Sequence, residues 1–145
     1  MKRNPWTTML AWSICLGMPI SVSASREEPY DAGSKLIIES QVSGSDGSHS
    51  VMVNTLTKSD REMERIGLEY VDIQRSSDLN TWITEVELGA VWMENSVSCE
   101  ISDRLVPVHG GYYYRVSVTH YAKSQGRLFS DSERIVDFSE PVWVG

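Results

Sequence analysis

Residues 105–121, LVPVHGGYYYRVSVTHY, decide the fold predicted for this chain, because they combine a sharp corner with a long strand. Pro107, Gly110 and Gly111 predict the corner, since proline fixes one backbone angle and glycine adopts left-handed ones without strain. After the corner, bulky residues alternate with mostly polar ones, and this period of two predicts a strand with one buried face. The residues predicted to point inward are Tyr112, Tyr114, Val116 and Val118.

The rest of the chain predicts further strands that pack against this one. Alternating or β-branched stretches separated by turn residues make up residues 36–42, 51–57, 66–75, 82–88, 96–102 and 133–144. Their number and spacing predict an all-β fold, a single antiparallel β-sandwich of about seven strands.

Three local features qualify this prediction. The charged segment 58–65, KSDREMER, fits either a helical turn or the end of a long hairpin. Between Tyr70 and Val71 the apolar alternation changes phase, which predicts a bulge or a region buried on both faces. Asp78 and Asn80 predict a turn that is closed by their own side chains.

The first 24 residues have the features of a secretory signal peptide. Lys2 and Arg3 give a positive start, residues 6–20 are mostly apolar and uncharged, and small residues precede Ala24. The sequence therefore predicts cleavage between Ala24 and Ser25 and a secreted or extracytoplasmic location. An uncleaved membrane anchor is the alternative.

Cleavage defines the predicted domain organisation and charge. Residues 25–35 are predicted to be a flexible tether, and residues 36–145 the single sandwich domain. Because residues 1–24 contain two cations and no acid, cleavage changes the formal net charge from −7 to −9. An acidic domain binds nucleic acid and anionic membranes poorly, so we expect no nucleic-acid partner and no membrane binding after cleavage. The charge favours solubility and a basic partner.

Cys99 is the only cysteine that remains after cleavage, so no internal disulfide can form. It lies in phase with Val97 and Ile101, which predicts a buried structural thiol. The domain is therefore expected to be held together by its apolar core.

The chain resembles the fibronectin type III domain over residues 51–144. Residues 70–82, YVDIQRSSDLNTW, resemble the third strand of that family, and residues 97–107, VSCEISDRLVP, resemble the strand before its Leu-x-Pro corner. Residues 112–121 are similar to its long Tyr-x-x-x-Val strand. The resemblance implies a fibronectin-III/immunoglobulin-like arrangement of the sandwich.

A narrower resemblance concerns two short segments. Residues 28–40, EPYDAGSKLIIES, together with residues 111–116, GYYYRV, are similar to a family of small secreted proteins from Gram-positive bacteria. That family has no assigned activity, so the resemblance implies secretion and leaves the function open.

The sequence contains no recognisable catalytic, metal or cofactor motif. His49, His109 and His120 lie at no metal-ligand spacing, and no G-x-S-x-G motif surrounds a nucleophilic serine. We therefore expect no enzyme activity, no metal and no cofactor. A small secreted hydrolase is an alternative if folding brings two carboxylates or a serine–histidine pair into one pocket.

Exposed aromatic and arginine side chains are the candidate binding surface. Alternation places Tyr113 and Tyr121 outward beside Arg115, and tyrosine with arginine is typical of binding surfaces. Arg127 and Phe129 extend this candidate surface from a nearby loop.

The predicted function is non-catalytic binding of an extracellular protein or glycan. Loops 76–81 and 124–132, predicted to lie at one end of the domain, are candidate contacts, because sandwich domains present binding residues on loops. The alternative is a structural component of envelope or matrix that associates with itself through edge strands.

Tyr112 is predicted to form a tyrosine corner. Its ring is expected to pack beside Leu105, and its hydroxyl is expected to bond a backbone group within residues 104–107. The residues to which we give a structural role are Trp82, Cys99, Leu105, Pro107, Tyr112 and Tyr114.

Overall fold

The computed structural model describes residues 35–126 and 128–145, which form an all-β structure. The chain divides into two units, residues 1–31 and 32–145, and every described residue belongs to the second. The predicted cleavage site at Ala24 and Ser25 lies outside the described residues, as does the predicted tether except Lys35. Within the described ranges, no helix is long and apolar enough to cross a membrane.

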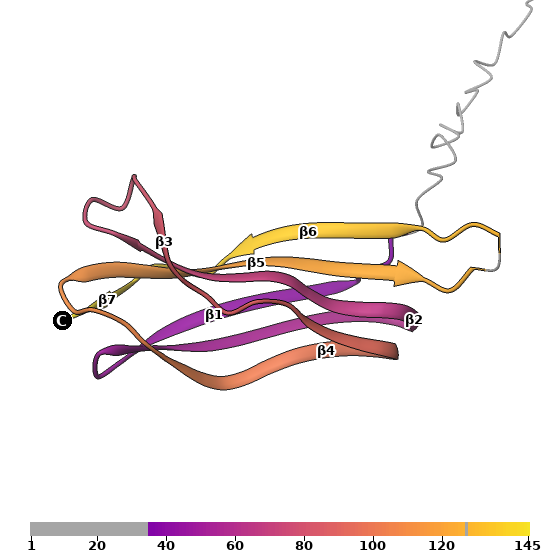
Figure 1. Cartoon of the computed structure of the whole chain (residues 1–145), viewed down its shortest axis with the longest axis horizontal. Helices are drawn as coiled ribbons and strands as arrows, with labels where there is room; N and C mark the ends of the chain where they lie inside the picture. Colours follow the sequence, from indigo (N-terminus) through magenta and orange to yellow (C-terminus); the bar gives the residue numbers. More distant parts are fainter. Residues whose placement is uncertain (1–34, 127) are drawn as a thin grey trace, which may run out of the picture. The chain divides into compact units, whose positions relative to one another are not determined.

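Seven strands form one antiparallel sheet (Figure 1), which confirms the predicted all-β antiparallel class. The main path through the sheet is β1–β2–β5–β6, with β3 and β4 paired to β2 and β7 paired to β5. The strands are β1 (Glu39–Gly47), β2 (Ser50–Ser76), β3 (Ile83–Glu87), β4 (Val91–Pro107), β5 (Tyr112–Ser124), β6 (Ser132–Phe138) and β7 (Val142–Val144).

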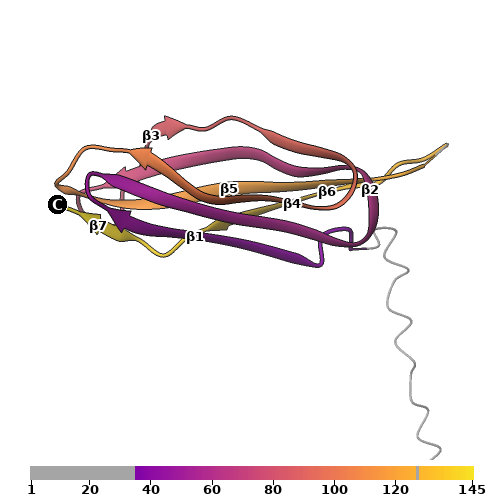
Figure 2. The same cartoon turned by 90° about the horizontal axis from the view of Figure 1, so that it is seen from below.

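Strand β2 organises the sheet because it is 27 residues long and changes partners along its length. Its first half, residues 50–58, pairs with β1 on one edge and with β4 on the other. Its second half, residues 63–76, pairs with β5 on one edge and with the start of β4 and then β3 on the other. Figures 1 and 2 show β2 and β4 turning back together at one end, so the sheet curls over on itself.

The turn in β2 lies at residues 59–62. Lys58 pairs with Ser98, and Met63 pairs with Ser96, so residues 59–62 of β2 lie opposite the single residue Val97 of β4. Such unequal counts form a bulge, which bends the strand that carries the extra residues. Segment 58–65, which the sequence alone leaves open between a helical turn and a hairpin end, is therefore strand.

A second bulge in β2 explains the phase change in the sequence. Against β5, Leu68 pairs with His120 and Tyr70 pairs with Thr119, so Glu69 is the extra residue. Leu68 is fully buried, whereas Tyr70 is 61% exposed. The predicted irregularity between Tyr70 and Val71 is confirmed as a bulge one residue earlier.

The main apolar core joins the two halves of β2. Val51 and Val53 from the first half meet Val71 and Ile73 from the second half in one buried cluster. Each fully buried aliphatic side chain contributes about 1.5–3 kcal/mol, so these contacts hold the curl closed. Strand β5 adds the predicted inward residues Tyr114, Val116 and Val118. A second cluster contains Leu36, Ile37, Met63, Ile66, Cys99 and Ala122.

Side chains of β6, the last strand of the main path, form hydrogen bonds with β1, the first strand, and with the residues just before it. The Glu133 carboxylate accepts hydrogen bonds from the backbone N–H groups of Leu36 and Ile37, at 2.6 and 2.8 Å. The Ser40 hydroxyl of β1 donates to the Asp137 carboxylate. These bonds satisfy backbone donors just before β1 and hold it beside β6, although no ladder joins the two strands.

The predicted corner between β4 and β5 is present, but the tyrosine that closes it is Tyr114 and not Tyr112. The Tyr114 hydroxyl donates to the carbonyl of His109 at 2.7 Å, and the whole residue is buried. Tyr112 is only partly buried, and the Arg75 guanidinium lies 4.6 Å from the centre of its ring. The hydroxyl that reaches back to the corner is thus two residues further along the same face.

Two other structural predictions were wrong because bulges shift the phase of β4. Leu105 is 58% exposed, and its neighbour Val106 is buried instead. The pairing of β4 with β2 slips between Arg104 and Ile101, so residues on either side of the slip alternate in different phases. Val97, the single residue inside the turn, is likewise exposed although an inward position was predicted.

The strand boundaries also differ from the prediction. The stretches 51–57 and 66–75 merge into β2, whereas 133–144 divides into β6 and β7 around Pro141. Loops 76–81 and 124–132 do not share one end, because Ser76 pairs with Tyr113 at the start of β5 and Ser124 pairs with Met63 at its finish.

The turn after β2 forms as predicted. Asp78 accepts hydrogen bonds from the backbone N–H groups of Asn80 and Thr81, at 2.9 and 2.8 Å. These bonds, joined by one from the Ser76 hydroxyl, lower the pKa of Asp78 to about 2.

Tyr114→Phe tests the corner. The Glu85 carboxylate is a second acceptor for the same phenol hydrogen, with its oxygen 3.0 Å from the phenol oxygen, so two acceptors share one donor. Burial, followed by the hydrogen bond with Glu85, raises the pKa of Tyr114 to about 12. Removing the hydroxyl leaves the His109 carbonyl without this donor, so we expect a loss of about 1–2 kcal/mol in the free energy of unfolding, measured by denaturant melts. Tyr113→Phe is the matched control and is expected to cost little. Equal losses in both variants would contradict the role of Tyr114.

Candidate functional site

Three of the predicted binding residues lie on the outward face of β5. Tyr113, Arg115 and Tyr121 are partly exposed, and they alternate with buried residues such as Tyr114 and Val116. Alternation along a strand places such residues on opposite faces, so the outward residues share one surface. This surface contains the side chains of neighbouring strands as well.

Arg115 lies at the centre of this surface between two aromatic rings. Its guanidinium carbon is 4.3 Å from the ring centre of Trp82 and 4.3 Å from that of Phe138. Its Nε donates to the Gln74 side chain at 2.8 Å. Trp82, to which a structural role was assigned from the sequence, is only partly buried and covers the guanidinium from the turn before β3.

The charge of Arg115 has no carboxylate partner. Among the arginines within residues 35–126 and 128–145, Arg61, Arg65, Arg75 and Arg134 form ion pairs, whereas Arg104 and Arg115 form none. Of these two, Arg104 is exposed and only Arg115 is partly buried. Burial lowers the pKa of the guanidinium, which nevertheless stays protonated at neutral pH. Arg115 is thus a desolvated cation that rings and one amide hold in place.

Aromatic pairs flank Arg115 on both sides along β5. Tyr113 packs edge-on against Trp143 of β7, with ring centres 4.9 Å apart. Tyr121 packs edge-on against Trp92 of β4, with ring centres 5.3 Å apart. The arginine beside Tyr121 is Arg134, 4.8 Å from its ring centre, and not Arg115 as predicted.

Neighbouring strands complete this surface with residues that sequence reasoning missed. Tyr70 and Val136 both pair with Thr119 of β5, from β2 and β6, and both are more than half exposed. Alternation predicts the outward direction of such residues but not which strand lies beside which. We call the whole surface the arginine face, made up of Tyr70, Trp82, Tyr113, Arg115, Tyr121, Val136, Phe138 and Trp143.

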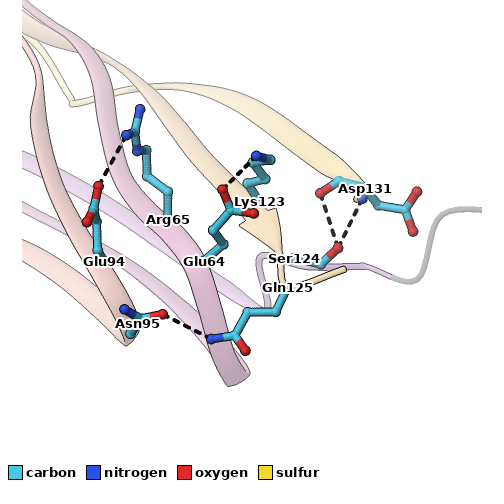
Figure 3. Close-up of polar contacts among 8 residues, drawn as sticks. All are labelled: Glu64, Arg65, Glu94, Asn95, Lys123, Ser124, Gln125 and Asp131. Atoms are coloured by element: carbon cyan, nitrogen blue, oxygen red, sulfur yellow. Dashed lines mark hydrogen bonds and ion pairs between the residues drawn. The ribbon is translucent and has the colours of Figure 1, made fainter. Parts of the chain in front are cut away.

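Phe129, which was predicted to extend the binding surface, is not part of the arginine face. It lies in the loop between β5 and β6 and is 90% exposed. Figure 3 shows the base of this loop, where the Ser124 hydroxyl donates to the Asp131 carbonyl and accepts a hydrogen bond from the Asp131 N–H. Ion pairs and amide contacts surround that base, including Lys123–Glu64 at 2.7 Å. Arg127 lies outside the described residues.

A row of polar side chains, buried at Thr57 and His120 and partly exposed at Asp137 and Ser40, runs from β2 to β6. His120 of β5 is fully buried, and its Nδ1 is 2.7 Å from the Thr57 hydroxyl, which also lies 3.2 Å from the Gly67 carbonyl. Its Nε2 is 3.5 Å from the Asp137 carboxylate but makes no hydrogen bond. Ser40 completes the row through its bond to Asp137.

This row has the residue types of a catalytic triad, but its hydroxyl is inaccessible. Thr57 is fully buried and is not among the residues that line the cavity described below, so a substrate in that cavity could not contact its oxygen. A nucleophile must contact the reacting atom, so this geometry fits a structural row that ties β2 to β5. The row was missed in the sequence because its members come from four different strands.

Beside this row lies an open cavity of about 640 Å³. Its walls come from β1, β2, β4 and β6, and Asp137 and Glu100 are among the lining residues. Two carboxylate residues thus share one pocket, which is the condition stated for the hydrolase alternative. Thr55, whose hydroxyl is buried without a hydrogen-bond partner, also lines it. In the described part of the chain, no three His, Cys, Asp or Glu side chains come together to hold a metal.

Cys99 is buried, as predicted from its phase. It is 3% exposed, and its sulfur lies 3.6 Å from the Val91 carbonyl. Burial, followed by the charge of Glu100, raises the pKa of the thiol, which reduces the thiolate fraction at neutral pH.

A thiol reagent should therefore label Cys99 only after denaturation. The measurement uses a chain that starts at Ser25, in which Cys99 is the only thiol. We expect full labelling in denaturant and almost none in buffer over the same time. Rapid labelling of the folded protein would contradict the buried position.

The buried imidazole predicts a pH dependence of stability. Burial lowers the pKa of His120, and attraction to Asp137 offsets this only in part. The unfolded state, with a pKa near 6.5, therefore takes up the proton first, so stability is complete above about pH 6.5 and falls below it.

Melting temperatures between pH 7.5 and 5 test this dependence. We expect His120→Gln to lose less of its melting temperature across this window than the unsubstituted protein. The matched control is His109→Gln, because the His109 side chain is 83% exposed. Parallel curves for all three proteins would contradict the assignment to His120.

Comparison of the chain with protein-family models, curated proteins and solved structures gave no significant match. The resemblances stated from the sequence therefore rest on its residues alone.

Proposed function

We propose that this protein is an extracytoplasmic, non-catalytic binding module, fibronectin type III-like in fold, which binds a protein partner through the arginine face. The strand pairing supports the fold. The order β1–β2–β4 for the first half of β2, and β2–β5–β6 for its second half, corresponds to the two strand groups of an immunoglobulin-like sandwich. The tyrosine closing the corner before β5 supports it as well.

The unpaired guanidinium of Arg115 is the observation that carries the function. Holding a cation at a partly desolvated position without a carboxylate is unfavourable for the isolated domain. A partner carboxylate would pair with this group in a bidentate geometry, which is why arginine is common at the centres of interfaces. The surrounding rings would exclude water from that pair.

A protein fits this surface better than a glycan does. Sugar rings stack on open aromatic faces, whereas Arg115 covers the rings of Trp82 and Phe138, and Arg134 covers that of Tyr121. The exposed apolar side chains of Tyr70 and Val136 beside an arginine match the composition of protein interfaces. The partner would present an acidic side chain surrounded by apolar ones.

Site-specific photocrosslinking tests this proposal. A photoreactive residue at Tyr70 or Val136, in the arginine face, should capture a partner from the cell surface. The same residue at Leu105, which is exposed on β4, should not. Arg115→Gln should abolish capture at Tyr70, because the partner carboxylate loses its cation.

Arg104→Gln is the matched control, since Arg104 is an exposed arginine on β4. It should leave capture unchanged, and both variants should keep the melting temperature within a few degrees. Equal capture at Leu105, or capture that survives Arg115→Gln, would contradict the proposal. Adducts between two copies of this chain would instead support the self-associating alternative.

A further inference from the structure

The outer edge of β6 is an unpaired sheet edge that borders the arginine face. Strand β6 pairs with β5 on one edge, and among the described residues no strand pairs with its other edge. Two side chains of the arginine face, those of Val136 and Phe138, come from β6, and both residues are about half exposed. A second chain bound along this edge would therefore extend the sheet beside the arginine face.

The hydrogen bonds with β5 show which backbone groups of β6 point to the outer edge. At one end of this ladder the Ser124 N–H donates to the Asp131 carbonyl, and at the other end the Ser139 N–H donates to the Val116 carbonyl, both at 2.9 Å. The register between these ends has no slip. In an antiparallel pair, residues that bond to the neighbouring strand alternate with residues that do not. The residues of β6 whose N–H and C=O groups point away from β5 are therefore Ser132, Arg134, Val136 and Phe138.

These outward backbone groups are available to a ligand. No other described residue forms a hydrogen bond with them. The segment before β1 lies close by, but the N–H groups of Leu36 and Ile37 bond to the Glu133 side chain and not to the β6 backbone. An unpaired edge is a template on which another extended chain can pair. The edge thus presents alternating donors and acceptors that match the backbone of an extended peptide.

The opposite border of the arginine face is less suited to such pairing. It consists of β3 and the start of β4, and β3 has only five residues and a slip in its pairing with β2. In that part of β4, Asn95 has a left-handed backbone with a φ of 50°. Such irregularities interrupt the even spacing that an added strand needs. Strand β6 has seven residues, and none of them is proline or has a positive φ.

A second copy of this chain fits the outer edge less well than a different chain does. An antiparallel pair of β6 strands centred on Val136 would place Ile135 of each copy opposite Asp137 of the other. Moving the centre by one residue brings carboxylates together, either Glu133 opposite Asp137 or Asp137 opposite itself. Like charges directly opposite one another are destabilising, and the net charge of −7 adds a general repulsion. The observations therefore favour a segment of another protein.

We propose that the partner of the arginine face binds the outer edge of β6 with an extended segment, which adds to the sheet as a further strand; this step rests on the proposed function. Side chains directly opposite Val136 and Phe138 would stand on the same face as these two residues. The Arg115 guanidinium carbon lies 4.3 Å from the centre of the Phe138 ring, so an acidic side chain opposite Phe138 would lie beside the cation. Backbone hydrogen bonds supply the affinity, and the acidic side chain supplies the specificity.

Residue-resolved amide hydrogen exchange of the purified protein tests the strand addition. The probe is a blocked peptide of the same length as β6, with glutamate at its amino end followed by alternating threonine and valine. In the free protein, the Val136 N–H should exchange at least tenfold faster than those of Ile135 and Asp137, because only these two bond to β5. Excess peptide should slow exchange at Val136 and Phe138 at least fivefold. Absence of slowing at millimolar peptide would overturn the proposal.

Two controls test whether backbone groups carry the binding. A peptide with the same side chains and methylated valine nitrogens cannot donate to β6, so equal slowing by it would overturn the proposal. Val136→Pro removes one outward N–H without a ladder bond and should weaken peptide binding at least tenfold. Val136→Ala keeps that N–H and should weaken binding less, so equal losses in two folded variants would contradict strand pairing. If Val136→Pro fails to fold, the methylated peptide still decides the question.

A peptide with glutamine in place of glutamate separates this proposal from the proposed function. The glutamate peptide should bind several-fold more tightly, and Arg115→Gln should remove that preference. Slowing at Val136 without such a preference would support strand addition and contradict the role of Arg115. A preference that depends on Arg115, without slowing at Val136, would support the proposed function and overturn strand addition. Slowing that grows with protein concentration in the absence of peptide would identify a second copy as the occupant and overturn the proposal as well.

Discussion

The length of β2 is the constraint on which the rest of the structure depends. A straight strand of 27 residues would extend about 90 Å at roughly 3.4 Å per residue, which is far longer than strands of ordinary domains. Every backbone N–H and C=O along it also needs a partner on each edge. The strand meets both conditions by turning back at residues 59–62 and sharing its two edges among β1, β5, β4 and β3. The core then forms where its two halves face one another, and the bulges determine which side chains enter that core.

Local signals in the sequence predicted the features that depend on adjacent residues. Pro107 and the glycine pair marked the corner, alternation marked the buried face of β5, and Asp78 marked its turn. The tyrosine corner was assigned to Tyr112, whereas Tyr114 forms it. Alternation places both tyrosines on the same face, so it cannot show which of the two hydroxyls reaches the backbone of the corner. The predictions that placed Leu105 and Val97 inward were wrong for a related reason. Each lies beside a slip in the pairing of β4 with β2, and alternation cannot be carried across such a slip.

Features that depend on distant pairing were not predictable from the sequence. Arg115 was identified as a binding residue, yet its neighbours Trp82 and Phe138 come from the turn before β3 and from the end of β6. The polar row likewise joins Thr57, His120 and Asp137 from three strands. A single sequence gives the inward or outward direction of each side chain but not the register between strands. It therefore predicts which residues are available for a site and leaves their grouping undetermined.

Strand β6 connects the polar row to the arginine face through consecutive residues. Asp137 lies beside the buried imidazole and lines the cavity, while the ring of Phe138 packs against the Arg115 guanidinium on the outward side. Asp137 and Phe138 thus bring one strand into contact with the buried imidazole and with the guanidinium. Because Phe138 also lines the cavity, substituting it would change the arginine face and the cavity wall at once. Arg115 does not line the cavity, so removing its charge changes the arginine face alone and isolates the contribution of the cation to partner binding.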